Sequence, residues 1–94
     1  MNATAARIQA RMDATQIEIN TVDGECRSNV RHLQRKLEGL NTPCDVDHNM
    51  ILEIIAVGEA LRNALCEKRG HIEKMEILRA VRNEALWASG PERP

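Results

Sequence analysis

The sequence predicts an all-α protein whose core is a long antiparallel helical hairpin. Apolar residues recur at steps of three and four along residues 2–40 and again along 48–89, which is the period of an amphipathic helix. Between these arms, residues 41–47 hold a proline and two aspartates, residue types that end one helix and begin another. We therefore expect one helical domain over residues 1–89, followed by a flexible tail over residues 90–94.

The first arm follows a heptad, with Asn29 and Lys36 as its polar exceptions. Val30 and Leu37 widen the apolar stripe toward the loop, and a wide stripe suits a helical bundle better than a two-stranded coil. The apolar or small members of the heptad are Ala5, Ile8, Met12, Thr15, Ile19, Val22, Cys26, Leu33 and Leu40.

One segment of the first arm allows two interpretations. Residues 20–24 read Asn-Thr-Val-Asp-Gly and combine helix-capping residues with a glycine. The arm is either one long helix or a short N-terminal helix followed by a longer one.

The loop at residues 41–47 has clear boundary signals. Pro43 disfavours helix at Thr42, because its ring clashes with the preceding residue. Asp45 or Asp47 can cap the next helix by accepting its free amide hydrogens, and a negative charge there suits the helix dipole.

The second arm carries an apolar stripe that matches the first arm when the chain is folded about the loop. The members of this stripe are Ile51, Ile54, Ile55, Gly58, Leu61, Leu65, Ile72, Met75, Leu78, Val81 and Ala85. Folding brings Leu33 near Ile54 and Val22 near Leu65. The residues predicted to form the core or oligomer seam are Ile8, Met12, Ile19, Leu33, Ile54, Leu61, Leu65 and Ile72.

Composition favours an oligomer, a dimer or larger, because a two-helix hairpin of 94 residues buries too little apolar surface by itself. Thirteen basic and fourteen acidic residues nearly cancel, which makes nucleic-acid binding unlikely. No signal peptide or membrane-spanning run is visible. Three cysteines at irregular spacing fit reduced thiols, so we expect a cytoplasmic protein.

No catalytic, cofactor or metal motif is predicted. Cys44 and His48 supply only half of the ligands that zinc needs. Cys26 and Cys66 fall on the inward stripes, where buried thiols act as small apolar groups. His32 and His71 are isolated, and no arrangement for nucleophilic catalysis is present. We expect a protein that is not an enzyme and holds no cofactor.

Two features are candidates for binding a ligand or partner. Arg27, Arg31 and Arg35 recur every four residues, which places three guanidinium groups on one helix face. Trp87 is the only aromatic residue, and tryptophan is enriched in interface hot spots. It is expected to be partly buried, either closing the bundle end over Ile8 and Met12 or contacting another subunit or partner.

Residues 47–88 resemble a phage helical-hairpin family that sequesters cyclic oligonucleotide immune signals. The resemblance rests on Asp47-His48-Asn49, which opens a helix, and on Glu84-Ala85-Leu86-Trp87-Ala88, which closes one. It implies an oligomer of long antiparallel helices that holds ligand between subunits. The chain departs from this pattern because its N-terminal helix has no aromatic residue to stack on a base.

These observations lead to one main hypothesis for function. A non-catalytic helical interaction module would bind a partner protein as an inhibitor, adaptor or regulator in a phage or bacterium. The first alternative is an oligomeric sponge that sequesters a cyclic oligonucleotide or another anionic small ligand through the arginines. A weaker alternative is a nucleic-acid-binding dimer.

Overall fold

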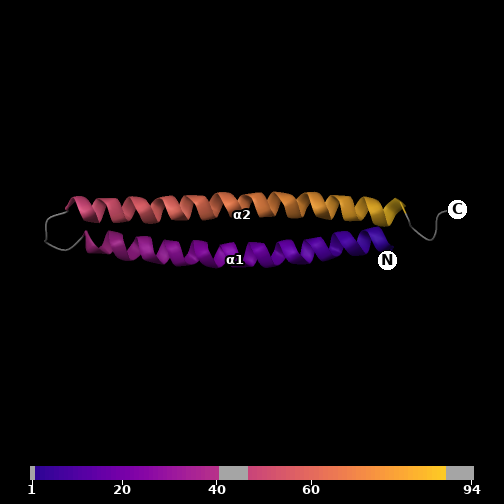
Figure 1. The fold of residues 1–94 in the computed structure, drawn as a ribbon, viewed down its shortest axis with the longest axis horizontal. Coiled ribbons are helices and arrows are strands. Elements are labelled where there is room, and N and C mark those ends of the chain that lie inside the picture. The colour runs from indigo at the N-terminus through magenta and orange to yellow at the C-terminus, as the bar shows by residue number, and fades with distance from the viewer. Residues whose placement is uncertain (1, 41–46, 89–94) are drawn as a thin grey trace. The chain divides into compact units, whose positions relative to one another are not determined.

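The computed structural model describes residues 2–40 and 47–88, and these form two α-helices. Helix α1 spans Ala3–Gly39 and helix α2 spans His48–Ala88 (Figure 1). The two helices run antiparallel, so the predicted all-α helical hairpin is confirmed. Most of the predicted loop and the whole of the predicted tail lie outside the described residues.

Side chains cap both helices at their N-termini. Asn2 Oδ1 accepts a hydrogen bond from the backbone amide of Ala5 at 2.7 Å, which satisfies a free donor of the first turn of α1. Asp47 Oδ1 accepts one from the backbone amide of Met50 at 2.8 Å and does the same for α2. Of the two aspartates that the sequence offered as caps, Asp47 therefore has this role, while Asp45 lies outside the described residues.

Helix α1 passes through residues 20–24 as a single helix from Ala3 to Gly39. The alternative of a separate short N-terminal helix is therefore wrong. Local polar pairs support the helix on both sides of this segment: Gln16 Nε2 donates to Asn20 Oδ1 at 3.0 Å, and Arg27 pairs with Asp23. Such pairs at a spacing of four residues stabilise the helix locally.

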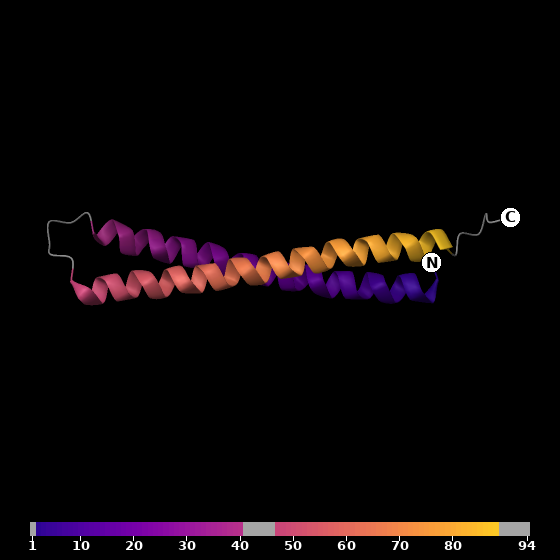
Figure 2. The same ribbon diagram turned by 90° about the horizontal axis from the view of Figure 1, so that it is seen from above.

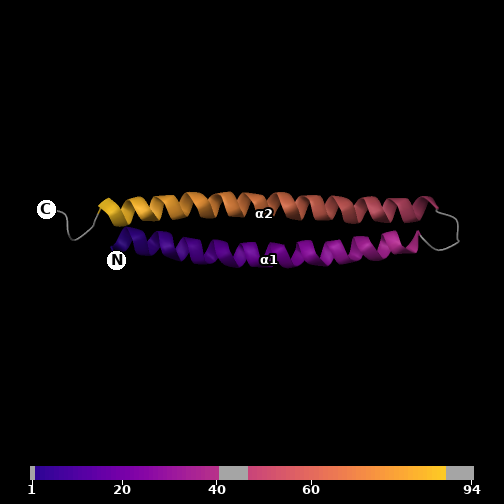
Figure 3. The same cartoon turned by 180° about the vertical axis from the view of Figure 1, so that it is seen from behind.

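The chain divides into two compact units. Unit 1 combines residues 1–20 with residues 69–94, and unit 2 consists of residues 21–68. Within each unit, a segment of α1 lies beside a segment of α2, as the views in Figures 2 and 3 show. We call the line of contact between the two helices the seam of that unit.

The seam of unit 1 buries Ala5, Met12, Thr15 and Met75. Three cross-helix polar contacts fix its register: Asn2 Nδ2 to the Ala85 carbonyl at 3.1 Å, Arg82 Nη1 to Gln9 Oε1 at 2.6 Å, and His71 Nδ1 to Glu18 Oε2 at 3.0 Å. The Thr15 hydroxyl donates to the Arg11 carbonyl at 2.8 Å, so this buried polar group is satisfied within α1.

The seam of unit 2 buries Val22, Cys26 and Ala64. Two ion pairs fix its register, with Lys68 Nζ 2.6 Å from Asp23 Oδ1 and Lys36 Nζ 2.7 Å from Glu53 Oε2. The partly buried seam positions of this unit include Asn29, Leu33, Ile54, Val57 and Leu61.

Six of the eight predicted seam residues lie on a seam, and two do not. Met12 is buried, and the five that are partly buried are Ile8, Ile19, Leu33, Ile54 and Leu61. Leu65 and Ile72 are exposed, so their predicted place in the seam between α1 and α2 is wrong. On α2 one column of the expected heptad stays in the seam, as Ile54, Leu61 and Met75 show. The other column lies one residue earlier than the apolar pattern predicts, so Ala64 and His71 take the places of Leu65 and Ile72. A contact of Leu65 or Ile72 with another subunit stays a prediction.

Candidate functional site

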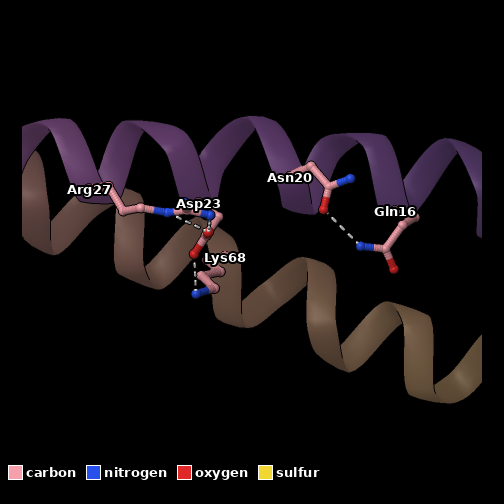
Figure 4. A network of polar contacts seen from close by, with 5 residues as sticks. All are labelled: Gln16, Asn20, Asp23, Arg27 and Lys68. Atoms are coloured by element: carbon pink, nitrogen blue, oxygen red, sulfur yellow. Dashed lines mark hydrogen bonds and ion pairs between the residues drawn. The ribbon is translucent and has the colours of Figure 1, made fainter.

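Asp23 is the centre of a charged cluster in unit 2. Its carboxylate accepts hydrogen bonds from Lys68 Nζ at 2.6 Å and from Arg27 Nε at 3.0 Å, with a further contact from Arg27 Nη2 (Figure 4). Arg27 comes from the next turn of α1, whereas Lys68 reaches across from α2. The cluster therefore joins the two helices and neutralises a carboxylate beside the seam.

The cluster shifts the pKa of both ion-pair partners on α1. Hydrogen bonds from Lys68 and then from Arg27 lower the pKa of Asp23 from 3.8 to about 2. The hydrogen bond to Asp23 raises the pKa of Arg27 above its ordinary value. Arg27 is thereby committed to a partner within its own helix, which sets it apart from the other two arginines of the predicted site.

Asp23→Asn is expected to lower the melting temperature of the protein at pH 6 but not near pH 2. Because the folded state lowers the pKa of Asp23, the stabilisation is present above about pH 4 and is lost as the pH falls toward 2. Thermal unfolding followed by circular dichroism at both pH values measures the difference. Glu25→Gln, which changes an exposed carboxylate two residues away, is the control. A deficit of equal size at both pH values would contradict this role.

Arg31 and Arg35 line a surface hollow of about 270 Å³ together with Ser28 and His32. All four residues belong to α1, where a spacing of three or four residues places side chains on one face. The structure thus brings together two of the three predicted arginines. Two guanidinium groups, a hydroxyl and an imidazole can all donate hydrogen bonds to an anion.

Trp87 lies near the end of α2 with 77% of its surface exposed. The prediction that it packs inside its own chain over Ile8 is therefore wrong. A contact with a subunit or partner stays a prediction, and the exposed indole offers a large area for it. Leu86 beside it is also exposed, as is Ile77 earlier on the same helix.

The two described cysteines have different environments. Cys26 is buried in the seam of unit 2, as predicted, whereas Cys66 is exposed on α2. The prediction that Cys66 faces inward is wrong, because the seam passes through Ala64 and Lys68, and Cys66 lies midway between them on the outer side of α2. Cys44 lies outside the described residues, so the prediction about the Cys44–His48 pair also falls outside them. In residues 2–40 and 47–88, no group of three or more His, Cys, Asp or Glu side chains could hold a metal ion.

Sequence analysis missed the polar residues of the seams. His71, predicted to be isolated, contacts Glu18, and Arg82 contacts Gln9. Lys68 was likewise not recognised as a partner of Asp23. Each of these residues on α2 occupies a seam position. Lys68 and Arg82 continue the seven-residue spacing of Leu61 and Met75, whereas His71 belongs to the column that lies one residue earlier than the apolar pattern.

We found no protein family, curated protein or solved structure that matches this chain. The resemblance of residues 47–88 to phage proteins that sequester cyclic oligonucleotides therefore stays a prediction. Neither described helix is long and apolar enough to cross a membrane.

Proposed function

We propose that this chain is a non-catalytic helical interaction module that binds a partner protein as an inhibitor, adaptor or regulator. The observation that carries the proposal is the apolar surface of the described helices. Twelve large apolar side chains are exposed there, including Trp87. Large apolar side chains left in contact with water favour burial against a partner. The three cysteines at irregular spacing fit a role in the reducing cytoplasm.

Trp87 is the residue that we expect to contribute most to the partner contact. It presents a large, rigid side chain to solvent, and burying it against a partner costs little side-chain freedom. Within residues 2–40 and 47–88 there is no other aromatic group that could serve as such an anchor.

The test is capture of the partner by a tagged chain from its native host, followed by affinity measurement with the purified partner. Trp87→Ala is expected to raise the Kd about 30-fold, which corresponds to a hot-spot loss of roughly 2 kcal/mol. Ile77→Ala, at an exposed position on the same helix, is the matched control and is expected to leave the Kd within a few-fold. Equal affinity of wild type and Trp87→Ala would contradict the assignment of this anchor.

The hollow beside Arg31 and Arg35 supports a second candidate function, the binding of an anionic small ligand such as a cyclic oligonucleotide. The double variant Arg31→Ala/Arg35→Ala is expected to lose a ligand that co-purifies with the chain and is released by heat. Arg27→Ala is the control, because Asp23 already occupies that guanidinium. Helicity is expected to persist in both variants, since alanine favours helix. Loss of ligand in the control alone would contradict this site.

A further inference from the structure

The hollow on α1 lies in a stretch of the helix whose charged side chains are all basic. Residues 26–37 contain three arginines and one lysine, and they contain no aspartate or glutamate. Two of these four cations pair with carboxylates from outside the stretch: Arg27 with Asp23 (Figure 4), and Lys36 with Glu53. The other two cations, Arg31 and Arg35, are the ones that line the hollow.

Neither Arg31 nor Arg35 is neutralised by a carboxylate of the described chain. The acidic residues that flank the stretch on α1, Glu25 and Glu38, are exposed. Within residues 2–40 and 47–88, no carboxylate lies close enough to either guanidinium group to form an ion pair. An anion that enters the hollow therefore meets two positive charges and does not have to displace a protein carboxylate.

Both arginines point away from the seam of unit 2. Leu33 is a seam residue and lies two positions from each of them, which corresponds to about 200° around an α-helix. All four side chains that line the hollow are exposed. A ligand can therefore reach them without any opening of the hairpin.

The four lining residues form a diamond on the surface of α1. Arg31 and His32 are neighbours at its middle, Ser28 lies one turn before them, and Arg35 lies one turn after them. Each guanidinium group is a planar fork of donors that can hold two oxygens of a phosphate group. The hydroxyl and the imidazole supply further donors. Donors on several sides of one point match a tetrahedral anion better than a planar carboxylate, which has only two oxygens.

The charge of the hollow favours one class of phosphate. A phosphate monoester carries roughly 1.5 to 2 negative charges near pH 7 and has three free oxygens, whereas a phosphodiester carries one charge and has two free oxygens. In surroundings open to water, the additional charge at about 4 Å from two guanidinium groups favours the monoester roughly tenfold. The lining residues include no tryptophan, tyrosine or phenylalanine on which a base could stack.

We propose that the hollow formed by Ser28, Arg31, His32 and Arg35 is a binding site for a terminal phosphate group and discriminates against phosphodiesters. This inference rests on the second candidate function, the binding of an anion at the hollow, and it narrows the class of ligand. A cyclic oligonucleotide is then a poor ligand, because all of its phosphates are diesters. The group that the site recognises is present both on a free nucleotide and on a phosphorylated side chain of a partner protein.

Titration with adenosine monophosphate tests the proposal, with binding followed by the NMR shifts of the backbone amides of residues 28–35. Low ionic strength keeps the screening of these exposed charges small. Cyclic adenosine monophosphate is the matched diester, and adenosine is the matched ligand without phosphate. We expect the monophosphate to bind about tenfold more tightly than the cyclic diester, and adenosine to leave these shifts unchanged. No binding of the monophosphate, equal affinity for the diester, or equal shifts with adenosine would each overturn the proposal.

Variants of the arginines assign the binding to the hollow. Arg31→Ala/Arg35→Ala is expected to weaken the monophosphate at least tenfold while circular dichroism shows unchanged helicity, since alanine favours helix. Arg27→Ala is the matched control and is expected to keep the Kd within about twofold, because Asp23 already holds that guanidinium group. A double variant that binds the monophosphate as wild type does would place the ligand elsewhere and overturn the site.

Phosphoserine distinguishes the two sources of the phosphate group. Binding of phosphoserine at least as tight as that of adenosine monophosphate would support the site and assign it to a phosphorylated partner protein. Weaker binding of phosphoserine would support the site and assign it to a free nucleotide. Serine without phosphate is the control, and equal shifts with serine would overturn the proposal.

Failure of this site and failure of the proposed function can be told apart. A chain that binds no monophosphate but loses its partner protein through Trp87→Ala would remove the phosphate site and leave the interaction module. A chain that binds the cyclic diester as tightly as the monophosphate would remove the monoester assignment and leave the hollow as an anion site.

Discussion

Met75→Asp is expected to unfold unit 1, lowering the free energy of unfolding by about 3 kcal/mol or more. Met75 is only 7% exposed and lies on the seam opposite α1. Along α2, Met75 lies between the His71–Glu18 contact and the Arg82–Gln9 contact. The substitution removes a buried apolar side chain and introduces a carboxylate into the seam. The basic side chains on either side, His71 and Arg82, are already engaged with Glu18 and Gln9.

Two control variants separate burial from helix propensity in this experiment. Ile77→Asp introduces the same charge two residues along α2, where the side chain is 64% exposed, and is expected to change stability by less than about 0.5 kcal/mol. Met75→Leu nearly conserves volume and is expected to cost less than about 1.5 kcal/mol. Urea unfolding followed by circular dichroism measures all three. Equal losses for the two aspartate variants would show that Met75 does not lie in a seam.

The first helix could be predicted well from the sequence because its apolar heptad coincides with its buried face. Met12, Val22 and Cys26 are buried where the spacing of three and four residues placed them. The cap at Asp47 was also predictable, since an aspartate before an apolar run is a local signal that does not depend on tertiary packing.

The inward face of the second helix could not be predicted from apolar periodicity alone. Its most apolar positions include Leu65 and Ile72, yet the seam takes Ala64, Lys68 and His71 instead. Small side chains allow close approach of the helices, and a lysine can bury its aliphatic stem while its ammonium group reaches a carboxylate. Periodicity reports the whole apolar arc of a helix, and it does not tell which edge faces its own chain.

The candidate site was predictable only in its local part. The spacing of four residues correctly placed Arg31 and Arg35 on one face of α1. The pairing of Arg27 with Asp23 could have been found by the same rule, because acid and base four residues apart on a helix attract each other. The exposure of Trp87 depends on what packs against the end of α2, which no local pattern contains.

Thiol labelling is expected to show which side of α2 faces the seam, through a large difference between the labelling rates of Cys66 and Cys26. In a Cys44→Ser chain, Cys66 is expected to react with Ellman's reagent at the rate of a free thiol, because it is exposed. Cys26 is buried in the seam and can react only when unit 2 opens. An opening free energy of roughly 3 kcal/mol or more slows it at least about 100-fold.

The variants Cys26→Ala and Cys66→Ser, each combined with Cys44→Ser, assign the two rates to their residues. The slow phase is expected to disappear with Cys26→Ala and the fast phase with Cys66→Ser. Adding urea is expected to bring the slow rate up to the fast one, since unfolding removes the protection of Cys26. Two slow thiols in the folded protein would instead support the register in which Leu65 and Cys66 turn inward, and would contradict the seam formed by Ala64 and Lys68.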